Sequence, residues 1–291
     1  MTYFLGVDAG GSRCRARLVD GGRNLLAEVE RGPANARVGV DKLRAAILEI
    51  AREAFDAAAT PPDAAAKTRA GLGVAGLSRP GMAASVDAMD LPFADFRFDT
   101  DAAIAQLGAH NGDDGAILIL GTGSIAFIRV GEARITIGGY GFPISDEGSG
   151  AALGLSAMRH ALRALDGRTK PTPLSAAVTE RFDHSTALAV QWMDDATPAD
   201  YAALAPMVMT YAENGDEIAR SIVEDAVKHV ERFIETIFAK GARRCALAGG
   251  LAPRLRPWLR ARTSDRLCEP IGDPLDGALL LAGLPRHETD R

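Results

Sequence analysis

The chain has 291 residues, of which 47% are apolar, so it can bury a sizeable core, and its length favours two domains over one. With 33 basic and 38 acidic residues the net charge is −5, which gives no electrostatic footprint for nucleic acid or an anionic membrane surface. No apolar run approaches the roughly 18 residues of a membrane span, and the N-terminus lacks a signal-peptide pattern. We therefore expect a cytoplasmic protein.

The three cysteines, Cys14, Cys245 and Cys268, are far apart in the sequence and have no metal-like spacing. Their number is odd, which argues against a disulfide framework, and their spacing argues against a zinc site. We expect ordinary buried thiols.

The first part of the chain alternates short apolar strands with helices. Period-2 patterns predict strands at 3–8, 15–20, 69–75 and 96–98, the first two forming a hairpin. Helical spacing of apolar residues predicts helices over 43–58 and 101–110. The run Asn111-Gly112-Asp113-Asp114-Gly115 is a strong turn signal, and we place the domain boundary there, which gives domains 1–112 and 113–291.

Beyond this turn, the stretch GAILILGTGSIAFIRV repeats the opening design of strand, glycine turn and returning strand, which suggests a duplicated domain. Further patterns predict helices over 151–165 and 216–240, a strand at 245–248 and a last helix over about 274–283. We interpret segment 166–214 as helical connections. The alternation predicts an α/β fold, and it stays open whether the last helix packs back on the first domain.

The opening hairpin, GVDAGGSRCRAR, places an acid next to a glycine-rich turn. Such a turn lets consecutive backbone N–H groups point into one concavity, which binds phosphate oxygens. Asp8, at the strand end, would then hold Mg²⁺ directly or through water, because Mg²⁺ prefers a few carboxylates with phosphates and retained waters. Ser12 and Thr122 each offer a hydroxyl. The alternative that both turns are only tight hairpins stays open.

Two other phosphate-binding patterns are excluded. The stretch GLGVAG, Gly71 to Gly76, matches G-x-G-x-x-G, but Ser78-Arg79-Pro80-Gly81 follows it and cannot open the helix that a dinucleotide site requires. The sequence has no G-x-x-x-x-G-K-[ST], which excludes a P-loop kinase.

The sequence resembles the actin, Hsp70 and sugar kinase superfamily in three motifs, GVDAGGSRCRAR, ILILGTGSIAF and CALAGGLA, which look like its phosphate 1, phosphate 2 and adenosine motifs. Within that superfamily, it resembles the branch of BadF-type ATPases and N-acetylglucosamine kinases in GPANARVG, DTDA and GGYGFPISDEGSG. Bacterial glucosamine kinases are the most similar group. The six motifs occur in the right order over nearly the whole chain.

The resemblance implies two ribonuclease H-like domains, of the actin-like ATPase type, with a nucleotide cleft between them, and ATP and Mg²⁺ as cofactors. It assigns to the phosphates Gly10, Gly11, Ser12, Gly121, Thr122 and Gly123. It assigns Asp8 to Mg²⁺, and Gly249 with Gly250 to the nucleoside. The family's Gly-Trp-Gly of the sugar loop is Gly139-Tyr140-Gly141 here.

The same resemblance implies that Asp101 is the catalytic base. It implies that the sugar contacts Asn35, Asp101, Ser124, Gly139 and Asp146. Each role has a structural alternative. Asp101 and Asp146 each precede or open a helix, where an acid complements the macrodipole, with Asp99 or Thr100 as the cap beside Asp101. Asn35 suits a plain turn.

The implied function is an ATP-dependent kinase that phosphorylates the 6-hydroxyl of an amino sugar, with glucosamine first and N-acetylglucosamine as the alternative. A more distant alternative is a BadF-type ATPase that activates a dehydratase, whose iron–sulfur cluster the three cysteines do not match. Another is a non-catalytic sugar sensor, for which no DNA-binding pattern is seen. We expect ATP and an amino sugar as partners, no nucleic acid and no membrane, and a homodimer stays open.

Overall fold

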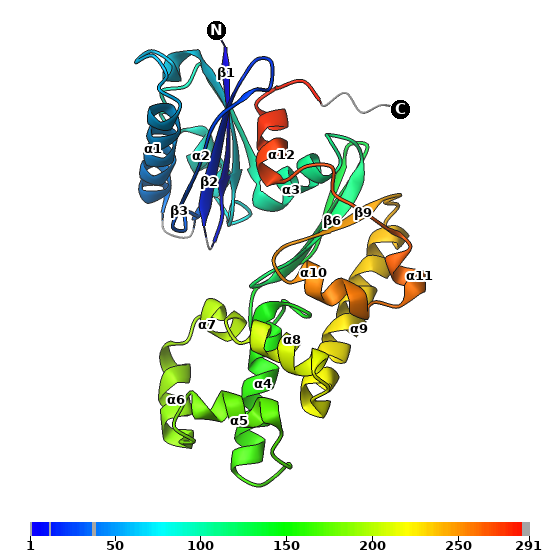
Figure 1. Cartoon of the computed structure of the whole chain (residues 1–291). Helices are drawn as coiled ribbons and strands as arrows, with labels where there is room; N and C mark the ends of the chain where they lie inside the picture. The colour runs from blue at the N-terminus through cyan, green and yellow to red at the C-terminus, as the bar shows by residue number, and fades with distance from the viewer. Residues whose placement is uncertain (1, 12, 37–38, 287–291) are drawn as a thin grey trace. The chain divides into compact units, whose positions relative to one another are not determined.

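A computed structural model describes residues 2–11, 13–36 and 39–286, and the chain divides into two compact units (Figure 1). The first unit consists of Met1–Gly115 together with the C-terminal segment from Glu269, and the second is Ala116–Cys268. The predicted division at residue 112 is therefore three residues early. The sequence left open whether the last helix packs back on the first domain, and the segment from Glu269, which contains the last helix, groups with the first unit.

The first unit is built on a five-stranded sheet with the strand order β3-β2-β1-β4-β5. Strand β1 pairs antiparallel with β2 and parallel with β4, and β4 pairs parallel with β5, so the carboxyl ends of β1, β4 and β5 meet at one edge. The strands are β1 (Tyr3–Ala9), β2 (Cys14–Asp20), β3 (Leu25–Arg31), β4 (Thr68–Val74) and β5 (Asp95–Thr100).

Helices cover this sheet on both sides, with α1 on one side and α12 with α3 on the other (Figure 1). Helix α1 (Val40–Ala57) buries Leu43, Ile47, Ile50 and Ala54, which share one face of the helix. The other helices are η2 (Ala65–Lys67), α2 (Met82–Asp87), α3 (Asp101–Ala109) and α12 (Pro274–Leu281).

Glycines explain why α12 packs in the first unit. A Cβ on Gly71 of β4 would lie 1.9 Å from the Ala278 carbonyl oxygen of α12. A Cβ on Gly277 of α12 would lie 1.8 Å from the Ile104 carbonyl oxygen of α3. Each contact brings a helix backbone to its neighbour at a distance that only glycine allows. Part of the GLGVAG stretch therefore serves helix packing, which agrees with its exclusion as a dinucleotide motif.

The second unit repeats this architecture, with the strand order β10-β9-β6-β7-β8. Numbered along the chain within each unit, both sheets have the order 3-2-1-4-5. This is the duplication that the two hairpins predicted, and it agrees with the ribonuclease H-like domains that the family resemblance implied. Strands β6, β9 and β10 are parallel. The strands are β6 (Gly115–Leu120), β7 (Ser124–Val130), β8 (Ala133–Gly138), β9 (Cys245–Ala248) and β10 (Leu267–Cys268).

The helices of the second unit include the connections predicted for 166–214. They are α4 (Gly150–Leu165), α5 (Pro173–Glu180), α6 (Thr186–Asp195), α7 (Pro198–Ala202), α8 (Ala205–Glu213), α9 (Glu217–Ala239), α10 (Ala252–Leu255), η3 (Arg256–Trp258) and α11 (Ala261–Ser264). Asp216 caps α9 by accepting from the Ala219 N–H at 2.9 Å, and it also accepts from the Leu174 N–H of α5 at 2.8 Å. This carboxylate joins two helices of the core.

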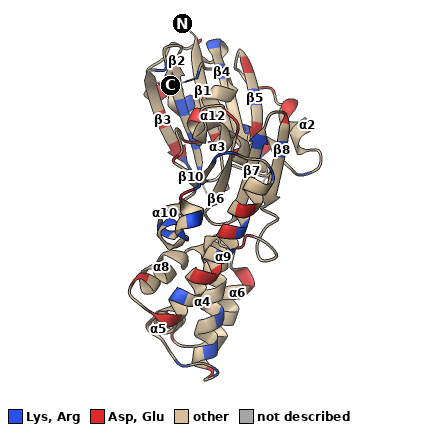
Figure 2. Cartoon of the chain, turned by 90° about the vertical axis from the view of Figure 1, so that its right-hand side faces the viewer, with Lys and Arg blue, Asp and Glu red and all other residues tan. Residues whose placement is uncertain are grey.

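The thiols of Cys14 and Cys245 are buried, and burial raises the pKa of each to about 12. Cys268 is half-buried. Lys, Arg, Asp and Glu are distributed over both units (Figure 2). None of the helices in the described residues is long and apolar enough to span a membrane.

The contact between α12 and α3 gives a first prediction. We expect Gly277→Ala to lower the free energy of unfolding by about 1–3 kcal/mol, because the added methyl group overpacks the interface. Helix propensity alone would make the change stabilising by about 1 kcal/mol, so the sign is diagnostic. Calorimetric unfolding measures it. Gly32→Ala is the control, since a Cβ there meets nothing within 4 Å, and a Gly277→Ala protein as stable as wild type contradicts the packing.

Candidate functional site

The predicted site residues of the first unit gather at the carboxyl edge of its sheet. Asp8 is the penultimate residue of β1, and Asp101 directly follows β5. Asn35 lies between two anchored neighbours, since the Ala34 N–H donates to the Gly10 carbonyl at 3.2 Å and the Ala36 N–H donates to the Ala75 carbonyl at 2.9 Å. The parallel arrangement of β1, β4 and β5 thus brings together residues that are far apart in the sequence.

The turn after Asp8 is held by a hydrogen bond from the Gly10 N–H to the Arg13 carbonyl, at 3.0 Å. A Cβ on Gly10 would lie 2.8 Å from that carbonyl oxygen, whereas a Cβ on Gly11 would meet nothing within 4 Å. Gly11 is exposed, so its backbone is accessible to a ligand. Ser12, the predicted hydroxyl donor, lies outside the described residues.

Asp8 is paired with an arginine that the sequence analysis did not single out. Arg15 stands directly opposite Asp8 in the β1–β2 register, and its Nη2 donates to Asp8 Oδ2 at 3.0 Å. Both side chains are 15% exposed. Burial raises the pKa of the Asp8 carboxyl, and the hydrogen bond and charge of Arg15 oppose this rise. The sequence did contain a signal for this pair: Arg15 is a charged residue in a largely apolar strand, across the hairpin turn from Asp8.

Arg15 also connects Asp8 to the start of α12. Its Nη1 lies 3.6 Å from Oδ2 of Asp273, the N-cap of α12. Arg17, two residues along β2, donates to both carboxylate oxygens of Asp273 at 3.0 and 2.9 Å and to Asp276 at 2.8 Å. Helix α12 is therefore linked by charge to the strand that faces Asp8.

Asp101 is the first residue of α3, and Thr100 is its N-cap. The Thr100 hydroxyl accepts from the Ala103 N–H at 3.1 Å, while Asp101 Oδ1 accepts from the Ala102 N–H at 2.9 Å. Burial raises the pKa of the Asp101 carboxyl, the Ala102 N–H opposes the rise, and the charge of Asp8 adds to it. The helix thus has a cap without Asp101, and the carboxylate lies within the electrostatic reach of Asp8.

In the second unit, the corresponding edge carries the other two glycine turns. The Gly121 N–H donates to the Gly123 carbonyl at 2.9 Å, and the Gly150 and Ala151 N–H groups at the start of α4 donate to the carbonyls of Gly121 and Thr122 at 2.8 and 3.1 Å. The turn after β6 is therefore fixed by the N-terminus of α4.

Gly249 and Gly250 follow β9, next to the end of β6. Gly249 has φ +90, and a Cβ there would lie 2.3 Å from the Leu120 carbonyl oxygen. Leu251 donates its N–H to the same oxygen at 3.0 Å. Gly250 is exposed, and a Cβ on it would meet nothing within 4 Å. Close packing therefore requires glycine at position 249, whereas Gly250 is accessible at the surface.

Ser124 and Asp146 lie together beneath the turn of Gly123. The Ser124 N–H is 3.4 Å from Asp146 Oδ1, and the Ser124 hydroxyl donates to the Glu147 carbonyl at 2.8 Å. Asp146 has φ +70 and is 8% exposed, and a Cβ on Gly123 would lie 2.9 Å from its Oδ2. Gly139 follows β8, where its neighbour Gly138 pairs with Ile125 of β7.

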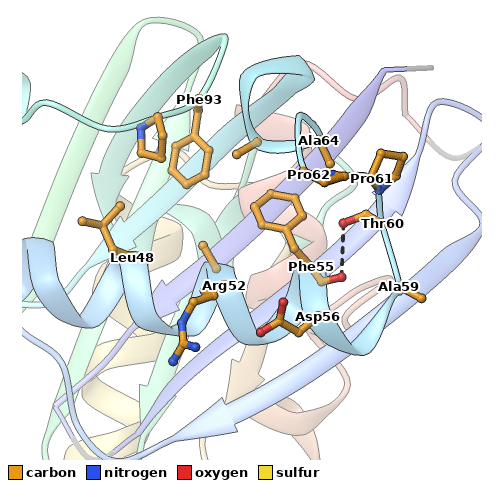
Figure 3. A pocket seen from close by; sticks show the side chains of 13 residues that line it. Leu48, Arg52, Phe55, Asp56, Ala59, Thr60, Pro61, Pro62, Ala64 and Phe93 are labelled. Atoms are coloured by element: carbon orange, nitrogen blue, oxygen red, sulfur yellow. Dashed lines mark hydrogen bonds between the residues drawn. The ribbon is translucent and has the colours of Figure 1, made fainter.

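A cavity of about 410 Å³ lies elsewhere on the first unit, along the C-terminal half of α1 (Figure 3). The rings of Phe55 and Phe93 line it together with Pro61, Pro62 and Pro92. Its hydroxyl group, on Thr60, donates to the Phe55 carbonyl at 3.1 Å. None of the predicted site residues lines this cavity.

The carboxylates do not form a preformed metal cage. Within the described residues, no group of three or more His, Cys, Asp or Glu side chains is placed to hold a metal ion. Asp8 Oδ2 is engaged by Arg15. The other oxygen of Asp8, Oδ1, is enough for Mg²⁺, because this ion takes most of its ligands from phosphates and waters. A single carboxylate oxygen is too few for a metal that is bound by protein side chains alone.

The chain is similar to known proteins over nearly its whole length. Glucosamine kinase GspK of Vibrio cholerae serotype O1 is 34% identical over 287 residues, which are 99% of this chain and 98% of that protein. A crystal structure from Chromobacterium violaceum, described as a candidate N-acetylglucosamine kinase, is 35% identical with a TM-score of 0.91 and covers 97% of this chain and 99% of that one.

A more distant structure shares the fold alone. It is the ROK family glucokinase from Streptomyces griseus in complex with glucose and AMPPNP, at 17% identity and a TM-score of 0.55, covering 97% of this chain and 99% of that one. The sequence pattern of one family matches residues 5–282, which include both glycine hairpins, the whole of the second unit, most of the first unit and the whole of α12. The chain therefore belongs to the BadF/BadG/BcrA/BcrD ATPase family.

Proposed function

We propose that the protein is an ATP-dependent kinase that transfers the γ-phosphoryl group to the 6-hydroxyl of an amino sugar, with glucosamine as the first choice. The observation that carries this proposal is the full-length likeness to a glucosamine kinase, in which 99% of this chain takes part. The aligned span therefore includes both glycine hairpins and the positions of Asp8 and Asp101. These residues supply what phosphoryl transfer requires, which is positioning and charge stabilisation.

The phosphates of ATP are assigned to the turns at the carboxyl edges of the two sheets. The residues assigned to the phosphates are Gly10, Gly11 and Ser12 in the first unit and Gly121, Thr122 and Gly123 in the second. Backbone N–H groups in glycine turns can donate to phosphate oxygens because no Cβ stands in the way. Gly249 and Gly250 are assigned to the nucleoside, which the open surface of Gly250 supports.

Asp8 is the residue assigned to Mg²⁺. Its Oδ1 receives no hydrogen bond from the described residues, while Arg15 orients the carboxylate through Oδ2. The ion, when bound with ATP, would supply charge neutralisation on the phosphates. The chain's own part is to orient this carboxylate, which Arg15 does through Oδ2, and the charge of Arg15 opposes the rise in its pKa that burial causes.

Asp101 is the proposed general base. Its carboxylate is anchored by one oxygen to the Ala102 N–H, and burial raises its pKa above that of an ordinary aspartate. A base of higher pKa accepts the 6-hydroxyl proton more readily. Asn35, Ser124, Gly139 and Asp146 are assigned to the sugar, where side-chain acceptors and donors pair with adjacent hydroxyls.

N-acetylglucosamine is the second candidate substrate. The Chromobacterium violaceum structure, at 35% identity, favours it. The two sugars differ at C2, where a free amine is cationic and needs an acceptor, whereas an acetamide needs an apolar pocket.

An ADP-release assay with glucosamine, N-acetylglucosamine and glucose tests the function. We expect turnover with all components present and the highest kcat/KM with glucosamine, because the full-length curated relative is a glucosamine kinase. A higher kcat/KM with N-acetylglucosamine selects the second candidate. ADP release that does not depend on any sugar contradicts a kinase.

The role of Asp101 gives a further prediction. Asp101→Asn keeps the shape of the side chain but cannot accept a proton at neutral pH, so kcat should fall by about 10²–10⁴-fold. The Kd values for sugar and ATP, measured by calorimetry, should change little, because the amide can still hydrogen-bond the hydroxyl.

Asp99→Asn is the matched control, since Asp99 lies two residues away and its carboxylate accepts from the Thr100 N–H at 2.8 Å. Its kcat should stay near that of wild type. If Asp101 is only a helix-end acid, Asp101→Asn instead costs roughly 0.3–1 kcal/mol of stability and leaves kcat nearly intact.

A further inference from the structure

Four aromatic side chains of the second unit form a continuous series of ring contacts that begins in the loop of Asp146. Phe142 of this loop contacts Tyr201 of α7, with ring centroids 5.1 Å apart. Tyr201 meets Trp192 of α6 at 4.9 Å in an edge-on arrangement, and Trp192 meets Phe182 at 5.4 Å. Aromatic pairs at such separations attract each other beyond the effect of the area they bury. The loop therefore rests on the helices of 166–214.

Among the large apolar side chains of this loop, Phe142 is the one that packs inward. Tyr140 is 83% exposed and Ile144 is 91% exposed, whereas Phe142 packs against the core of the unit. The position of the loop therefore depends on what Phe142 contacts.

Tyr201 is itself rigidly held. It is 7% exposed, and a Cβ on Gly154 of α4 would lie 1.9 Å from the Tyr201 carbonyl oxygen. One turn earlier, a Cβ on Gly150 would lie 3.2 Å from Ala202 Cβ. Helix α7 is thus in close contact with the first two turns of α4, and its ring is presented from a fixed backbone.

The turn that contains Phe142 leads directly to Asp146. The Ser145 N–H donates to the Gly141 carbonyl at 2.9 Å and closes this turn. Asp146 follows with φ +70, in the left-handed region that non-glycine residues adopt infrequently and that Asp adopts more readily than most. Contacts that fix the position of Phe142 therefore also fix the position of the Asp146 carboxylate.

We propose that Tyr201 is a positioning residue for the amino sugar, because its ring holds, through Phe142, the turn that presents Asp146. The inference rests on the proposed assignment of Asp146 to the sugar. It gives the helices of 166–214 a role in substrate recognition, and it makes Trp192 a reporter of sugar binding.

The test compares Tyr201→Leu with Tyr201→Phe and with Tyr211→Leu in the full-length chain. Tyr211 of α8 packs against the same core without a ring contact to the loop, so it is the matched control. We expect Tyr201→Leu to raise the KM and Kd of the amino sugar by about 3- to 10-fold, the effect of losing the aromatic pair between Tyr201 and Phe142 of the loop. The KM of ATP should stay within about twofold, and Tyr201→Phe should behave like wild type.

Trp192 provides a readout that does not depend on turnover. The chain has two tryptophans, so Trp258→Phe leaves Trp192 as the single emitter. Titration of this protein with glucosamine or N-acetylglucosamine should shift the Trp192 emission, and adding Tyr201→Leu should abolish the shift. If Tyr201→Leu does not fold, Phe142→Leu removes the other ring of the same pair and carries the same expectation.

Two results overturn the inference. One is a Tyr201→Leu protein whose sugar Kd equals that of wild type, and the other is an equal loss of sugar and ATP affinity in Tyr201→Leu and Tyr211→Leu. Failure of the proposed function looks different. A wild type that binds an amino sugar in the fluorescence titration but does not phosphorylate it contradicts the kinase, while the Kd comparison between the Tyr201 variants still decides the positioning role.

Discussion

Helix α12 reaches the centre of the first sheet because glycine occupies each position where two backbones meet. Gly6 and Gly71 allow the helix to pack closely on β1 and β4. Gly108 and Gly277 allow it to pack closely on α3. A single methyl group at Gly108 would stand 1.9 Å from the Asp273 carbonyl oxygen. Packing of this density has no slack, so the location of α12 fixes the location of α3. Asp101 opens α3, and its carboxylate is placed by the same contacts.

The charges at the start of α12 follow from that packing. Asp273 caps the helix and binds Arg17 through both carboxylate oxygens, at 3.0 and 2.9 Å, while Arg15 lies between Asp273 and Asp8. An Arg–carboxylate pair with two hydrogen bonds fixes geometry as well as charge. The unit therefore controls two carboxylates by different means. Asp8 has an arginine beside it, whereas Asp101 has a backbone N–H and the field of Asp8.

Local patterns were sufficient to predict the hairpins, the strand before Asp101 and the long helix α9, because hydrophobic periodicity and turn residues lie close together in the chain. Edge strands β3 and β8 were missed because they bury little: only Ala27 is buried in β3, and no residue is buried in β8, so the apolar signal in the sequence is weak. The partner of Asp8 follows from register, and the ring contact of Phe142 with Tyr201 follows from tertiary packing. Neither is encoded in a window of neighbouring residues.

The return of the C-terminal segment means that the second unit is an insertion within the first. During synthesis, β1 to α3 leave the ribosome first, then all of Ala116–Cys268, and only then α12. Gly6 and Gly71 lack their α12 neighbour throughout that interval, so the unit whose synthesis starts first is the last to be completed. Loss of the final residues by premature termination or proteolysis would therefore damage the N-terminal unit and its carboxylates, and would leave the unit next to the cut in the sequence intact.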